Sequence, residues 1–102
     1  METIKESRTS EAPAIGAYTD YRHYLRDFYD YKRQLTRNDL RPYSYATFAA
    51  GADIKSPNYL KLIIDGQRNL SREMAVKFSK ALALSKEELE EFLALVDFTQ
   101  AT

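Results

Sequence analysis

Apolar residues recur along most of the chain at the three- and four-residue steps of an amphipathic helix. The first such run covers residues 18–35, and Thr19 or Asp20 stands where a helix N-cap is needed. Its opposite face carries charged side chains such as Arg22, so one face is predicted to be buried and the other solvated. The apolar positions of the run are Tyr21, Tyr24, Leu25, Phe28, Tyr31 and Leu35.

A loop rich in turn-forming residues then leads to two short helices, predicted over residues 44–52 and 56–64. A serine is placed to cap the start of each. In the second helix Ser56 is the N-cap, Pro57 suits the first helical position, and Gly66 suits the stop. The turn between the two helices is expected to be about three or four residues long.

Two more helices complete the pattern. One begins at Ser71, with an apolar stripe that ends at Leu82. The last helix is predicted to begin at Ser85, because Ser85 and Glu88 have the spacing of a capping box. Apolar residues that face the core follow at helical steps. The chain is therefore predicted to be all-α, with a flexible N-terminal arm over residues 1–17 and one five-helix domain over residues 18–102.

Composition narrows the class of protein. A chain of 102 residues is long enough to bury a core, and it fits one domain. Because there is no cysteine, disulfides and thiolate zinc sites are excluded. The N-terminal residues include several charges where a signal peptide needs an apolar stretch, and no apolar run has the length of a membrane span. We therefore expect a cytoplasmic protein without a membrane segment.

Charge is balanced overall but unevenly distributed. Fifteen basic and fifteen acidic residues cancel, which argues against a nucleic-acid partner because DNA affinity depends on neutralising phosphates. Residues 41–72, however, carry a local charge of plus three, from Arg41, Lys55, Lys61, Arg68 and Arg72 against Asp53 and Asp65. Residues 86–97 are acidic, with Lys86 as their single base.

The two short helices have the arrangement of a helix-turn-helix, whose second helix enters the major groove of DNA. Leu60 and Ile63, three residues apart, are expected to face the core. The outward residues near the start of that helix would then meet base edges or phosphates: Ser56, Asn58, Tyr59, Lys61 and, less directly, Leu62. Asparagine can pair with an adenine edge, lysine can reach guanine or phosphate, and tyrosine can donate to phosphate.

The segment after the second helix adds candidate contacts to the DNA backbone. It leads into the N-terminus of the next helix, where backbone N–H groups favour an anion such as phosphate. Arg68, Asn69 and Ser71 are the candidates there, and Lys55 is a further candidate in the turn before the second helix.

The run from Phe48-Ala49 to Ile54, then residues 56–66 and 68–71, resembles the phage-repressor (XRE-like) helix-turn-helix. The stretch S-P-N-Y-L-K-L-I-I-D-G-Q-R-N-L-S is still more similar to an uncharacterised bacterial family. Its members carry such a domain at the N-terminus, followed by a larger C-terminal domain of unknown function. The resemblance covers roughly residues 18–100. It implies a DNA-binding part of a bacterial transcription regulator, with a C-terminal domain absent from this chain.

The chain departs from the phage-repressor pattern at the turn. Asp53 stands where that pattern usually has glycine, although aspartate tolerates the left-handed conformation better than most residues. The turn also has about one residue more than usual. An extra residue there rotates the second helix about its axis. The resemblance therefore indicates the motif more directly than it indicates which individual residues contact bases.

Two functions remain open at this point. The first is sequence-specific binding of double-stranded DNA, with a homodimer expected because one short recognition helix reads few bases. Such a dimer would use the first or last helix, where Tyr29 and Phe98 are the apolar residues least explained by the core pattern. The rival is a helical protein-interaction module that keeps the fold without binding DNA. Neither requires a cofactor or a metal, and no catalytic constellation supports an enzyme.

Overall fold

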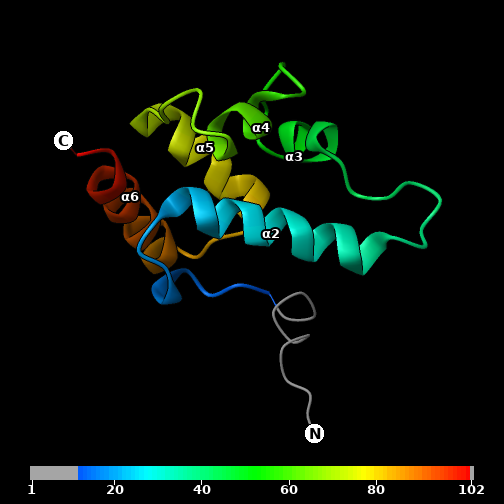
Figure 1. Ribbon diagram of the computed structural model, residues 1–102, viewed down its shortest axis with the longest axis horizontal. Helices are drawn as coiled ribbons and strands as arrows, with labels where there is room; N and C mark the ends of the chain where they lie inside the picture. Colours follow the sequence, from blue (N-terminus) through cyan, green and yellow to red (C-terminus); the bar gives the residue numbers. More distant parts are fainter. Residues whose placement is uncertain (1–11, 102) are drawn as a thin grey trace, which may run out of the picture.

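The computed structural model describes residues 12–101, and within this range it is entirely helical. These residues form five α-helices and one short 3-10 helix, with no strand among them (Figure 1). For the part of the chain described, the predicted all-α class with five helices is therefore confirmed. The elements are η2 (Ile15–Ala17), α2 (Tyr21–Thr36), α3 (Tyr45–Gly51), α4 (Tyr59–Ile64), α5 (Arg72–Leu82) and α6 (Lys86–Gln100). None of the helices described combines the length and the apolar character needed to cross a membrane.

Helix α2 lies through the middle of the molecule. Figure 1 shows α3, α4 and α5 on one side of it and η2 on the other, while α6 lies beside the N-terminal end of α2. α4 and α6 both pack on α2, α5 bridges α3 and α6, and η2 packs on α6. The two short helices α3 and α4 are thus held by longer neighbours.

The centre of the core is Phe78 of α5, which is fully buried. Its ring meets the rings of Phe48 from α3 and Tyr59 from α4 edge to face, with centroids 4.9 Å and 5.9 Å away. Leu60 and Ile63 of α4 are also buried, as the helical spacing predicted. Because one ring contacts both short helices, α5 fixes the position of α3 relative to α4.

Side-chain caps set the helix starts, and most of them were predicted. Asp20 caps α2 by accepting from the Arg22 N–H, and Ser71 caps α5 by accepting from the Met74 N–H. The Ser85 and Glu88 capping box of α6 is present. A second capping box at α3, from Ser44 and Thr47, was not predicted, because threonine is not the usual residue at that position.

Three helices end in the same way, with a left-handed residue that lets two backbone N–H groups turn back onto the last helical carbonyls. Those residues are Asp53 after α3, Gly66 after α4 and Ala83 after α5, with φ of 59°, 79° and 57°. After α5, for example, the N–H groups of Ala83 and Leu84 donate to the carbonyls of Lys80 and Ser79. The expected stop at Gly66 and the expected left-handed Asp53 are both confirmed.

The structure adds detail at the N-terminal segment and at the end of α2. A flexible arm was predicted over residues 1–17, and for residues 1–11, which lie outside those described, it stays a prediction. Ile15 of η2 is buried and belongs to the core. Leu35 was predicted on the buried face of α2 and is instead 61% exposed. The reason is that α2 extends past its neighbours at its C-terminal end, so periodicity continues where no partner helix covers it (Figure 1).

Truncation of Leu60 tests the buried face of α4. Leu60→Ala should lower the free energy of unfolding by about 2 to 5 kcal/mol, because it removes buried methyl groups and leaves a cavity. Leu40→Ala is the matched control, since Leu40 is fully exposed in the loop after α2 and its loss should change stability by less than about 0.5 kcal/mol. Urea unfolding followed by circular dichroism measures both, and equal midpoints would contradict this placement of α4.

Ala83 offers a test of the helix stops. An alanine in the left-handed conformation costs about 1 to 2 kcal/mol relative to glycine, partly offset by the greater freedom of glycine in the unfolded chain. Ala83→Gly should therefore raise the free energy of unfolding by up to about 1 kcal/mol. Ala94→Gly, at an exposed helical position of α6, should instead lower it by about 0.5 to 1 kcal/mol. Thermal melts of both variants would reveal a wrong sign for either.

Candidate nucleic-acid interface

The turn between α3 and α4 is longer than predicted. It spans residues 52–58, and Ser56 is not the N-cap of α4, which begins at Tyr59. Ser56, Pro57, Asn58 and Tyr59 form a turn closed by a hydrogen bond from the Tyr59 N–H to the Ser56 carbonyl, 3.4 Å long. Serine followed by proline is typical of a type I turn as well as of a helix start. The sequence signal was read correctly as a boundary and wrongly as the first helical turn.

Most of the predicted contact residues around α4 are exposed. Lys55, Ser56 and Asn58 lie on the surface of the turn, and Lys61 lies on the outer side of α4, opposite the buried face. Asn58 occupies the N-cap position of α4, but its side chain makes no capping hydrogen bond. The turn and the first turn of α4 therefore present several polar side chains together.

Tyr59 does not belong to this outer set. It was predicted to face outward, but only 9% of it is exposed, because its ring packs edge to face on Phe78. Helical spacing explains the difference. Tyr59 stands four residues before Ile63 and therefore shares its buried face, which consists of Tyr59, Leu60, Ile63 and Ile64.

The ammonium group of Lys61 is held by a neighbour on the same helix. It donates a hydrogen bond of 2.8 Å to the carboxylate of Asp65, and this bond raises the pKa of Lys61 above its ordinary value. The pair is exposed to solvent, and exposed pairs contribute little to stability. Lys61 thus stays charged, and its ammonium can exchange the carboxylate for another anion at small cost.

The loop between α4 and α5 carries the other predicted residues. Arg68 and Asn69 are exposed, and the Arg68 guanidinium lies over the Tyr59 ring, 5.3 Å from its centroid. This cation–π contact brings Arg68 back to the start of α4. Ser71 also lies at the surface, where its hydroxyl caps α5. Turn, helix and loop are therefore neighbours, although Lys55 and Ser71 are 16 positions apart in the sequence.

Arg22 of α2 is a residue of this region that sequence reasoning placed on a solvated face. Its guanidinium donates to the carbonyls of Ile63 and Arg68, the latter at 3.0 Å, and to the Asn69 side-chain oxygen at 2.9 Å. It also lies over the Tyr21 ring at 5.0 Å. Arginine's planar fork allows one side chain to bridge these acceptors. Arg22 consequently joins the end of α4 to the loop that follows it.

The loop between α4 and α5 is also held by Gln100, near the C-terminal end of the chain. The side-chain oxygen of Gln100, in the last turn of α6, accepts from the Leu70 N–H at 2.7 Å, and its amide nitrogen donates to the Leu70 carbonyl at 3.1 Å. The Tyr21 hydroxyl donates to the same Gln100 oxygen. The loop is therefore fixed by α2 and α6 together. Neither Arg22 nor Gln100 has a sequence signal that reveals it, because both contacts join distant parts of the chain.

Most of the tyrosines act in packing, as their spacing predicted; Tyr31, predicted on the buried face of α2, is only partly buried and lies outside the core cluster. Tyr21, Tyr24 and Tyr43 are buried, and burial raises the pKa of Tyr24 and of Tyr43 to about 12. Tyr29, which the core pattern did not explain, stacks face to face on Tyr45 of α3, with the ring centroids 4.1 Å apart. Because these rings pack against other parts of the fold, they are unsuited to stack on bases.

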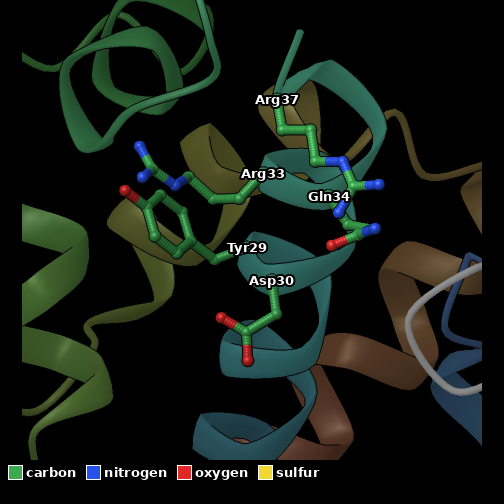
Figure 2. A pocket seen from close by; sticks show the side chains of 5 residues that line it. All are labelled: Tyr29, Asp30, Arg33, Gln34 and Arg37. Carbon is green, nitrogen blue, oxygen red and sulfur yellow. The ribbon is translucent and has the colours of Figure 1, made fainter. Parts of the chain in front are cut away.

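A hollow of about 390 Å³ on α2 is a rival site, but two of its residues have other roles. Figure 2 shows its labelled lining residues, all on α2 or at its C-cap: Tyr29, Asp30, Arg33, Gln34 and the C-cap residue Arg37. Arg33 lies beside the Tyr29 ring (Figure 2) and donates to the Tyr43 carbonyl at 2.9 Å. Two of the lining residues therefore already have structural roles: Arg33 holds the following loop, and Tyr29 packs on α3.

In comparisons with models of protein families, with curated proteins and with solved structures, no match to this chain was found.

Gln100 offers a test of how the loop is held. Gln100→Ala removes both hydrogen bonds to Leu70, each worth about 1 kcal/mol, so hydrogen exchange of the Leu70 amide should accelerate roughly five-fold or more. Arg22→Ala should loosen the same loop through Arg68 and Asn69. Arg26→Ala, exposed on the same helix and outside these contacts, is the control. Amide exchange by NMR reads all three, and an unchanged Leu70 rate in Gln100→Ala would show that Gln100 does not hold the loop.

Proposed function

We propose that this domain binds double-stranded DNA sequence-specifically, through a phage-repressor-like helix-turn-helix formed by α3 and α4, as part of a bacterial transcription regulator. The observation that carries the proposal is the two-sided character of α4. One side is sealed in the core by Leu60 and Ile63, and the other presents exposed polar residues beside a basic loop. A helix that enters the major groove requires this division.

In this mechanism Asn58 and Lys61 face the bases. Asn58 has a side-chain amide that no capping bond uses, and such an amide pairs with the edge of adenine. Lys61 leaves Asp65 for a guanine edge or a phosphate, while Lys55 and Ser56 approach from the turn. Tyr59 contributes from inside, by holding the α4 start against Phe78.

Phosphates are met by the loop after α4. Arg68 supplies a charge, and Asn69 and Ser71 supply polar donors beside the N-terminus of α5. Arg22 and Gln100 fix the backbone of this loop from behind. A rigid loop loses little conformational freedom on binding, and this increases the affinity obtained from each contact.

A single α4 covers few base pairs, so we also propose that the domain acts on DNA as a homodimer. The rival function, a protein-interaction module, is favoured by the zero net charge and by the acidic α6.

Two substitutions separate base reading from phosphate contact. Arg68→Ala should weaken binding to all duplexes alike and make affinity less salt-dependent, because one fewer counterion is released. Asn58→Ala should cost roughly 1 to 3 kcal/mol on the preferred site and little on random DNA. Both side chains are exposed, so thermal stability should change little. Fluorescence anisotropy over a salt series measures the affinities.

Lys86→Ala is the matched control, since it removes an exposed charge at the start of α6. It should bind as the wild type does. If the wild-type domain binds no duplex even at low salt, the DNA function is refuted and the interaction module replaces it. If it binds and both test variants equal the wild type, the orientation proposed for α4 is wrong.

A further inference from the structure

An apolar hollow of about 310 Å³ lies between η2 and α6, away from the residues proposed to meet DNA. It is lined by Ile15, Gly16, Tyr18, Glu91, Ala94 and Leu95. Its volume is at the lower end of the range for ligand pockets, about 300 to 1,000 Å³. It therefore fits one or two large side chains of a partner better than a cofactor.

The lining residues of α6 belong to one stripe that continues beyond the hollow. Glu91, Ala94 and Leu95 are followed at the next helical step by Phe98, which is 70% exposed. Among the described residues, Phe98 is the aromatic one of the large apolar side chains that are exposed. A hollow with an exposed aromatic ring one turn away is typical of a docking surface.

The charge around this surface selects its partner. α6 carries five acidic residues and one base, and no lysine or arginine occurs from Ala12 to Asp20, which includes η2. None of the described residues that line the hollow is basic, and Glu91 forms part of its wall. Two copies meeting through α6 would bring acid against acid, which is unfavourable at an interface. The surface is complementary to a basic partner.

We propose that the stripe Glu91–Phe98 of α6, together with η2, binds a basic amphipathic helix of another protein. Apolar side chains of that helix, three and four residues apart, fill the hollow and cover Phe98. Its lysines or arginines face the acidic flank that Glu87, Glu90, Glu91 and Asp97 form on α6. A homodimer on DNA then uses the outer face of α2 and not α6.

The η2 end of this site lies away from the proposed DNA face. Figure 1 shows η2 on the opposite side of α2 from α3 and α4. The proposal does not depend on DNA binding. The two can therefore fail independently.

The test uses the full chain, labelled with ¹⁵N, and three synthetic peptides of about 15 residues, the length at which an isolated helix begins to form. The first places leucine and phenylalanine on one helical face and lysine on the other. The second has the same composition in scrambled order, and the third replaces lysine by glutamate. At physiological salt the first should bind and shift the amide signals of residues 15–18 and 91–98. The other two should bind at least ten-fold more weakly.

Substitutions assign the binding to this surface. Phe98→Ser should weaken the basic peptide about ten-fold or more, because the ring it buries is lost. Glu91→Lys should weaken the basic peptide and strengthen the acidic one. Val76→Ser is the control, since Val76 is an exposed apolar residue on α5, outside the hollow.

The proposal is overturned if the scrambled peptide binds as well as the amphipathic one, or if the shifted signals lie elsewhere. It is also overturned if Phe98→Ser binds as the wild type does. Shifts of residues 91–98 that depend on protein concentration, without peptide, would assign the surface to a second copy and refute the heterologous partner.

Discussion

The rest of this structure depends on one constraint, which is that its two central helices are too short to be stable alone. α3 has 7 residues and α4 has 6, well under the roughly 12 to 15 at which an isolated helix becomes marginally stable in water. Phe78 meets this constraint, because its buried ring contacts Phe48 of α3 and Tyr59 of α4 together. The outer side of α4 is then free to be polar, since it contributes nothing to holding the helix.

The same constraint explains why the ends of α4 need help from outside. Its N-cap side chain makes no capping bond, and its C-terminal carbonyls are reached by the Arg22 guanidinium. The long helices α2 and α6 therefore supply what the short helix lacks. The loop beside it is fixed by the same two helices, through Arg22 and through Gln100 on Leu70. The same contacts from α2 and α6 therefore both stabilise the candidate interface and fix its position.

Local signals in the sequence were enough for the helices and most of their ends. The caps at Asp20, Ser71 and Ser85 and the stops at Asp53 and Gly66 each depend on neighbouring residues only, so spacing predicts them. The misplaced start of α4 has a different cause, because serine followed by proline suits both a helix start and a type I turn. Contacts between distant segments determine which of the two structures forms, and the spacing of residues along the chain does not reveal these contacts.

The side chains that hold the candidate interface were hidden for the same reason. Arg22 belongs by periodicity to a solvated face, yet its guanidinium reaches residues about 40 positions later. Gln100 spans 30 positions to Leu70. Tyr59 was the reverse case, a residue assigned to the surface that shares the buried face of Ile63, four residues later. The exposed polar residues Lys55, Asn58, Lys61 and Arg68 could be predicted, because they need only a surface position.

Zero net charge does not argue against a DNA-binding surface when basic and acidic residues lie on different parts of the surface. At physiological ionic strength exposed charges are screened beyond about 8 Å, so a local field depends on nearby groups and not on the total. The acidic residues of α6 flank η2, which lies on the far side of α2 from α4 (Figure 1). Near α4, Asp65 is neutralised by Lys61, and Asp53 is paired with Lys80 of α5 at 3.2 Å. This leaves Lys55 and Arg68 unopposed by these carboxylates, so the basic and acidic surfaces can serve different partners.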